Sequence, residues 1–421
     1  MTVYPLAATP ADIAAVSAVL KEVYPSDELE KQFYDQLNLL DMFEETTEYT
    51  DSNGEKAVLF LRTGRGGGIS ARAVGEQLAP PDHRKYSNVE YNYTNHYVQI
   101  AVNGPVVARM KSNRTSAIRH IDDEISVSLE DQQRDWVRQL HGAGDAVIAA
   151  SLPALSTAAQ WVPLGAANHW AVERGFLYPG QSVDIGTAAA PTSSTGGNPI
   201  IAVDATVGAP KIKLANQTTV TAGHSVSLAG NRSTDQAQRE LNGLGNMFGT
   251  GTFAGIDPTV DGNQFWQSKI QQHATPGTGR DLSLDILLGG LRALRQGGKY
   301  PDFLFGDLNQ EQRYYKLLQG QVRFAGEGNL ESGATEGLAF AKIKGGFVGD
   351  PDCKPGAIHM GRKDAIRRFS AGPCSWQNQT EGGSILHWRP DYDQFTARAA
   401  KYWQLGLIRR NTLCRIEDLN S

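Results

Sequence analysis

Residues 86–105 read YSNVEYNYTNHYVQIAVNGP, and this stretch decides how the fold is interpreted. Apolar or aromatic side chains occupy alternate positions along it, which is the period-two pattern of a half-buried strand. The alternating residues are Val89, Tyr91, Tyr93, His96, Val98, Ile100 and Val102. Pro105 then stands where a helix can begin, because proline fits the first helical turn. The stretch therefore predicts one long strand that runs directly into a helix.

A second strand is predicted upstream, at residues 57–61, which read AVLFL. The segment that joins the two strands contains TGRGGG at residues 63–68, which is too rich in glycine to pack. Together the strands predict a long two-stranded hairpin over residues 47–104. Such a ribbon is only marginally stable in water, so we expect it to lean on something outside its own domain. The glycine run lacks the third glycine and the Lys-Ser/Thr pair of nucleotide-binding loops, so no nucleotide site is predicted.

The helix that begins at Pro105 is predicted to extend to residue 141. An apolar stripe recurs along it every three or four residues, as on an amphipathic helix. The stripe is Ile118, Ile121, Ile125, Leu129, Gln132, Trp136 and Leu140, and it ends at Gly142–Gly144. A helix of roughly ten turns with one apolar stripe indicates an element that lies across a sheet.

The remaining chain mixes short strands with helices. Residues 160–232 alternate apolar runs with turn residues, which predicts an inserted β-rich module with its own core. Its runs are 175–177, 181–185, 200–203, 211–214 and 225–228. Farther on, helices are predicted at 282–294 and 310–318, around a buried strand at 302–306. Strands at 337–343, 357–360, 365–369 and 395–407 complete a chain of the α+β class.

Composition excludes several classes of protein. The 421 residues carry 40 Lys and Arg against 45 Asp and Glu, a net charge of −5, which does not suit a nucleic-acid-coating or membrane-surface protein. The acids are concentrated at the start, because the first 50 residues hold ten acids and two bases. We expect no signal peptide, since no basic segment precedes an apolar run near the first residues, and no membrane span, since no long apolar run occurs. The three cysteines suit a reducing cytosol.

No catalytic constellation is predicted. The nine histidines include no HExxH motif, and no Gly-x-Ser-x-Gly sequence presents a nucleophile. The segment Asp350–Cys353 is interpreted as a turn, and the scattered tryptophans as core or interface anchors. We therefore expect no catalytic residue, no metal site and no cofactor. Two other classes stay open: a cytosolic α/β enzyme built on residues 281–360, and a sugar-binding protein built on 160–232.

The order of these parts resembles the major capsid proteins of tailed bacteriophages, which have the Hong Kong 97-like fold. The resemblance gives an N-terminal arm of two short helices (1–46), an extended loop (47–104), a spine helix with the first part of the peripheral domain (105–159) and the inserted β-rich domain (160–232). An axial domain (233–383) and a peripheral return (384–421) follow. The most similar stretches are 244–257, Trp266, 282–315, 347–358 and 399–419.

This resemblance implies a structural protein that assembles into hexamers and pentamers of an icosahedral head. The shell would enclose double-stranded DNA without specific recognition and without a membrane. The implied partners are other copies of the chain, a portal protein and a scaffolding protein, with a decoration protein as a further candidate. The implied location is the virion capsid, assembled in the host cytoplasm. Since only about ten residues precede the first helix, we expect no N-terminal cleavage and a separately encoded scaffold.

Assembly contacts are predicted from charge. The acidic arm is expected to dock on a basic surface of a neighbouring subunit, and residues 342–368, with seven bases and three acids, are one candidate partner. The acids expected to take part are Asp27, Glu28, Glu30 and Asp35. The bases expected to receive them are Arg362, Lys363, Arg367 and Arg368. Subunits at quasi-equivalent positions of a shell need a flexible hinge, and we expect Gly64, Gly66, Gly67 and Gly68 to provide it.

The extended loop carries a further expectation. In the founding member of the resembled family, a loop lysine forms a covalent bond with an asparagine of a neighbouring subunit. Here the loop from Arg62 to Arg84 contains Arg65 and Arg72 but no lysine. An arginine stays protonated and cannot act as the nucleophile, but it can hydrogen-bond carboxylates of an adjacent subunit. We therefore expect a shell without covalent cross-links.

Overall fold

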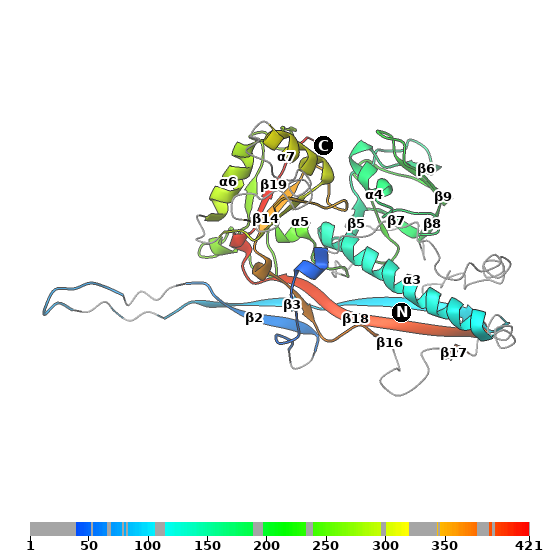
Figure 1. Cartoon of the computed structure of the whole chain (residues 1–421), viewed down its shortest axis with the longest axis horizontal. Coiled ribbons are helices and arrows are strands. Elements are labelled where there is room, and N and C mark those ends of the chain that lie inside the picture. The colour runs from blue at the N-terminus through cyan, green and yellow to red at the C-terminus, as the bar shows by residue number, and fades with distance from the viewer. Residues whose placement is uncertain are drawn as a thin grey trace, which may run out of the picture.

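The long ribbon is the most prominent feature of the computed structural model, and it projects beyond the rest of the molecule (Figure 1). The structure describes residues 39–51, 54–64, 69–77, 80, 83–105, 114–187, 197–232, 239–295, 300–319, 343, 346–376, 387–389 and 392–420. The predictions made for residues 1–38, 65–68 and 337–342 therefore lie outside the described residues. No helix in the described part of the chain is both long and apolar enough to span a bilayer.

The ribbon consists of β2 (Lys56–Arg62) and β3 (Tyr86–Asn92), paired antiparallel from Lys56 opposite Asn92 to Arg62 opposite Tyr86. The hairpin prediction is thus confirmed for this part. It is wrong beyond residue 92, because the alternating run is two strands rather than one. The second part, β4 (Thr94–Asn103), pairs over its whole length with β18 (Gln394–Leu407) instead of with the first arm.

Strand β18 is the centre of a six-stranded sheet. One edge of β18 pairs with β4, and the other pairs in turn with β17 (His387–Arg389), β16 (Ser375–Trp376) and β15 (Ile366–Ser370). Strand β1 (Glu45–Thr46) extends the sheet parallel to β15. The sheet that holds the peripheral return therefore also contains 366–376, which the expected division placed in the axial domain.

Helix α3 (Arg114–His141) lies along this sheet, as expected of a spine helix (Figure 1). Its 28 residues span about 42 Å. Of the predicted apolar stripe, Trp136 and Leu140 are buried, together with Val137. The side chains of Ile118, Ile121 and Ile125 lie outside the described residues.

A second sheet has its own core beside helices α6 (Leu284–Arg295) and α7 (Leu308–Gln319). Its order is β11-β19-β14-β12-β13. The strands are β11 (Lys269–Gln271), β12 (Phe303–Gly306), β13 (Val348–Gly349), β14 (Ile358–Gly361) and β19 (Cys414–Ile416). The end of the chain therefore completes this sheet, because β19 pairs with both β11 and β14.

The inserted module is a six-stranded antiparallel sheet ordered β5-β10-β7-β8-β9-β6. The strands are β5 (Val147–Ala149), β6 (Ala159–Pro163), β7 (Ser182–Gly186), β8 (Asn198–Asp204), β9 (Lys211–Thr218) and β10 (Ser225–Leu228). The module begins at β5, before the expected boundary at 160, because Ile148 and Leu152 belong to its core. The strand predicted at 175–177 is wrong: Gly175, at φ 69°, ends helix α4 (His169–Glu173) in a turn.

A shared core joins the parts. Leu40 and Phe43 from the arm, Tyr91 from the ribbon, Trp136 from α3 and Trp403 from β18 are buried in one cluster. Helix α5 (Leu244–Met247) and Trp266 pack into the same cluster. The short 3-10 helices are η1 (Leu39–Met42), η2 (Ala166–Asn168), η3 (Gln264–Trp266), η4 (Lys363–Ala365) and η7 (Arg410–Thr412). The base of the ribbon is thus anchored in its own chain, and only its outer part extends away.

Candidate functional site: assembly surfaces and the domain junction

The projecting ribbon has one covered face and one bare face. Leu59 and Val89 face each other across the strands and are buried at the base, whereas Phe60, one position along, is 75% exposed. Tyr86 is also exposed, and the loop beyond it carries Ile69 and Val74, both almost fully exposed. Isolated apolar side chains on a surface are ordinary, but a row of them along a projecting two-stranded ribbon is typical of an interaction surface.

The loop residues predicted from sequence are only partly described. Arg72 is exposed and makes no ion pair with any described residue. The backbone N–H groups of Thr63 and Gly64 both donate to the Lys85 carbonyl, at 2.9 and 3.3 Å, so Gly64 continues the ribbon. Arg65, Gly66, Gly67 and Gly68 lie outside the described residues, and the hinge stays a prediction.

The basic segment meets acids of its own chain. Arg367 pairs with Glu44 at 3.1 Å and Arg368 with Asp41 at 3.5 Å, while β1 and β15 run side by side. Arg362 pairs locally with Asp364, to which its Nε donates at 2.7 Å.

Lys401 adds a contact to Glu45 at 3.0 Å, which sequence reasoning did not identify. Of the four predicted bases, Lys363 is the exposed one without an ion pair among the described residues. The acids Asp27, Glu28, Glu30 and Asp35 lie outside the described residues, so docking on a neighbour stays a prediction.

A buried charged junction holds α3 against its neighbours. Three basic side chains are spaced i, i+4 and i+7 along the end of the helix, so they share one face. Each has a carboxylate partner: Arg134 pairs with Asp352 at 2.6 Å, Arg138 with Glu240 at 2.6 Å, and His141 with Asp350 at 3.0 Å. The carboxylates come from the turn at 350–352 and from the segment that leaves the inserted module.

The electrostatics of this junction favour the paired state. Burial by itself would raise the pKa of Asp350, but the hydrogen bond and charge of His141 hold it below its ordinary value. Burial would likewise lower the pKa of Arg138, yet Glu240 and Asp135 raise it above the usual range. Sequence reasoning identified the turn at Asp350 but missed its partners. The signal that could have indicated carboxylate partners was the spacing of Arg134, Arg138 and His141, which places them on one face of the helix.

The residues beside this junction do not form a thiol nucleophile. Cys353 Sγ lies 3.9 Å from His359 Nδ1, and both residues are buried. Burial raises the pKa of the Cys353 thiol well above its ordinary value and lowers the pKa of His359 well below. A nucleophilic cysteine needs the opposite shift, so this pair contributes packing. Among the described residues, no cluster of His, Cys, Asp or Glu has the arrangement of a metal site.

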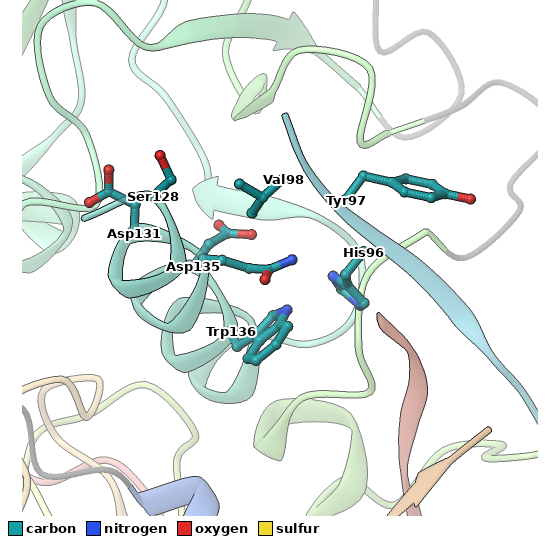
Figure 2. A pocket seen from close by; sticks show the side chains of 8 residues that line it. His96, Tyr97, Val98, Ser128, Asp131, Asp135 and Trp136 are labelled. Atoms are coloured by element: carbon teal, nitrogen blue, oxygen red, sulfur yellow. The ribbon is translucent and has the colours of Figure 1, made fainter. Parts of the chain in front are cut away.

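A groove of about 300 Å³ lies between α3 and β4 (Figure 2). The helix contributes Asp131, Gln132, Asp135 and Trp136, and the strand contributes His96. Burial lowers the pKa of His96 to about 4, so its ring is neutral near pH 7. The wall of the groove formed by the helix is acidic, because it carries Asp131 and Asp135.

Comparison with known proteins gave structural matches only. A scan against protein-family models and a sequence search of curated proteins each returned no match. The cyanophage A-1(L) capsid asymmetric unit matches with 14% sequence identity and a TM-score of 0.56, over 98% of this chain and 99% of that chain.

The capsid of a native GTA particle matches with 10% identity and a TM-score of 0.49, over 98% and 100% of the two chains. Mycobacterium phage Bobi matches with 10% identity and a TM-score of 0.45, over 97% and 98%. The assignment rests on the cyanophage structure, which this chain matches from end to end. The chain therefore has the Hong Kong 97-like fold of phage capsid proteins.

Proposed function

We propose that this chain is a major capsid protein, which assembles into hexamers and pentamers of an icosahedral head around double-stranded DNA. The observation that carries the proposal is the ribbon of β2 and β3. Its base is buried in the shared core, but its outer part presents Phe60, Tyr86, Ile69 and Val74 to solvent. Apolar groups held away from their own core gain stability when a neighbouring subunit covers them. The fold, which is that of capsid proteins, supports the same conclusion.

A structural role suits the chemistry of the junction as well. Its charged groups are paired with one another across α3, the 350–352 turn and Glu240, so they join the parts of the subunit. The sugar-binding alternative has little support, because, of the two tryptophans in residues 160–232, Trp170 packs against the core of the module, and the partly exposed Trp161 has Lys211 Nζ 5.2 Å from its ring centre. We infer that the protein is not an enzyme and needs no cofactor.

The partners and the division into parts belong to the same proposal. A portal protein, a scaffolding protein and a candidate decoration protein would meet the shell, and assembly would take place in the host cytoplasm before the chain becomes part of the virion. We retain the arm, extended loop, spine helix, axial domain and peripheral domain as its parts. The inserted domain is moved to begin at 147, since β5 belongs to its sheet.

Electron microscopy of the expressed full chain tests the proposal. We expect capsomers or closed shells of uniform size, alone or with a co-expressed scaffolding protein. The matched variant Phe60→Ser with Tyr86→Ser removes the bare apolar face without changing the buried face of the ribbon. It should fold but assemble poorly. A natural chain that stays a monodisperse monomer, both alone and with the co-expressed scaffolding protein, would contradict the proposal.

A further inference from the structure

We propose that Arg134 clamps the inserted module to the five-stranded sheet of β11, β12, β13, β14 and β19, so that the two parts move as one body. Without this side chain the module turns about the place where the chain enters and leaves it. The clamp lies within a single subunit and does not rest on the proposed function. Its basis is one guanidinium group that contacts both parts, together with the path of the chain at the end of α3.

The chain enters and leaves the inserted module at one place, which we name the pivot. The entering segment follows Gly142 at the end of α3, and the returning segment passes through Gly243 and Gly245. The Gly245 N–H donates to the Gly142 carbonyl at 2.9 Å, and a Cβ atom at Gly243 would lie 2.0 Å from the same oxygen. Two segments that cross in contact form a hinge, so contacts away from the pivot must fix the orientation of the module.

Arg134 makes contacts of this kind with the module. It precedes Gly142 by eight residues, which places it about 12 Å from the pivot along α3. Its Nη2 donates to the carbonyl of Arg174, and its guanidinium carbon lies 4.8 Å from the centre of the Phe176 ring. Phe176 is 3% exposed and belongs to the core of the module. Arg134 therefore holds the module both by its backbone and by its core.

The same guanidinium group reaches the five-stranded sheet. Arg134 Nη1 donates to Asp352 Oδ2 at 2.6 Å, and Asp352 is 2% exposed. The Asp352 N–H donates to Asp350 Oδ1 at 2.9 Å, and the Asp350 N–H donates to the carbonyl of Gly306, the last residue of β12, at 2.8 Å. The carboxylate is thus fixed to the sheet. Charge-assisted hydrogen bonds are strong, and a buried carboxylate without its partner is unfavourable, so this contact holds Arg134 firmly.

A second pair of charges faces the boundary between the two parts. Arg174 of the module lies near Asp307, which follows β12 directly. Burial raises the pKa of Asp307, and the positive charge of Arg174 acts in the opposite direction. The attraction between these two groups favours the same arrangement that Arg134 holds. Figure 1 shows both parts over the same end of α3, where a single side chain of the helix can reach each of them.

Distances between two spin labels test the clamp in the unassembled full chain. Labels are attached to Val207→Cys in the module and to Arg292→Cys on α6, which are both exposed positions. The exposed Cys374 is changed to Ser, and the other two cysteines are buried. Double electron–electron resonance should give a narrow distribution of distances with Arg134 present. Because the module then turns about the pivot, Arg134→Gln should widen the distribution about twofold.

The control is Gln133→Ala, which changes an exposed neighbour on the same helix and should leave the width unaltered. A width that Arg134→Gln leaves unaltered would overturn the inference. Asp352→Ala removes the carboxylate but keeps Arg134, and it should widen the distribution as well. The double variant should be no wider than Arg134→Gln alone, because both changes break one link. Additive widening would show that the two residues act separately, and would also overturn the inference.

Hydrogen exchange separates a clamp from a general support of the fold. In Arg134→Gln and in Asp352→Ala, the buried amides of β7 around Val183 and Ile185 should keep their protection to within about threefold of the natural chain. The module then stays folded and only its orientation changes. Loss of that protection in both variants would show that Arg134 maintains the fold of the module rather than its orientation, and the inference would fail.

Discussion

At the residue scale, Arg410 is one of the largest fully buried side chains of the described residues. It is completely buried, and its guanidinium donates to the carbonyl groups of Met247, Gly251 and Asn246 at 3.2, 2.6 and 3.0 Å. Its head group also lies 5.1 Å from the centre of the Phe253 ring. Burial lowers the pKa of Arg410 to about 10, so the group stays charged at neutral pH.

We predict that Arg410→Met lowers the free energy of unfolding by about 3 kcal/mol or more, because several buried carbonyl groups lose their donor at once. Urea unfolding followed by tryptophan fluorescence measures the change. The neighbouring Arg409 is exposed, and Arg409→Met is the matched control, with an expected effect below about 0.5 kcal/mol. Equal effects of the two variants would show that the carbonyl contacts of Arg410 contribute little.

His96 gives a pH dependence at the same scale. Burial lowers its pKa from 6.5 to about 4. As pH falls from 6.5 to 4, the unfolded chain binds a proton that the folded chain excludes, so stability falls over this window. A shift of this size corresponds to a loss on the order of 3 kcal/mol once pH reaches 4.

We predict that His96→Gln loses less stability than the natural chain between pH 6.5 and 4. Thermal unfolding monitored by circular dichroism at several pH values measures the slope. The exposed His83, changed to Gln, is the control and should leave the slope unaltered. Identical slopes for all three proteins would refute the assignment to His96.

At the element scale, the sequence predicted most strands and helices but not which strand pairs with which. The alternating run at 86–105 shows why. Its buried positions are Val89 and Tyr91, then Thr94 and His96, so the alternation changes phase at Tyr93. One strand cannot change the face it buries without an interruption. The phase change was visible in the sequence, whereas the pairing of β4 with β18, about 300 residues away, was not.

The junction shows a similar limit. Arg134, Arg138 and His141 share a helix face, which the spacing alone establishes. Their partners Asp352, Glu240 and Asp350 come from two distant segments, and no local pattern identifies them. The groove between α3 and β4 was missed for the same reason, since its residues come from two elements and two of those on α3 were interpreted as part of an apolar stripe.

The inserted module permits an element-scale prediction with defined cut points. The chain enters and leaves the module at neighbouring places, because the Gly245 N–H donates to the Gly142 carbonyl at 2.9 Å. A Cβ atom at Gly243 would lie 2.0 Å from the same oxygen, so the two segments are in close contact. Removing residues 147–232 and joining the ends with a short glycine linker therefore requires no large movement of α3.

We predict that this deletion yields a soluble chain that still forms capsomers. Removing only 160–232 should give insoluble protein, because Ile148, Ala149 and Leu152 would lose the core that covers them. The soluble fraction after expression and the sedimentation profile check both outcomes. If both deletions are insoluble, the module contributes to folding of the whole subunit, and the proposed independence fails.

At the scale of the whole molecule, the ribbon decides how a shell of this protein is held together. An amide cross-link between side chains requires a neutral amine next to its target, in a site that removes water from both groups. The loop from Arg62 to Arg84 contains no lysine. Lys56, on the flanking strand, pairs with Glu90 at 2.7 Å, and that hydrogen bond raises the pKa of Lys56 above its ordinary value. This amine is therefore held in its protonated, unreactive form.

We therefore expect cohesion to come from covered apolar groups, hydrogen bonds and ion pairs, none of which survives hot detergent. We predict that assembled particles, boiled in detergent and separated on a gel, give a single band near 45.6 kDa. The same particles treated first with glutaraldehyde should give a ladder, which shows that the gel would detect linked subunits. A ladder from untreated particles would contradict the prediction, since it would require a covalent bond made by groups other than an amine of the projecting loop.

Ion pairs on a surface are screened by salt, whereas the burial of apolar area is not. Particles should therefore lose little stability in molar salt if Phe60 and Tyr86 dominate the contact between subunits.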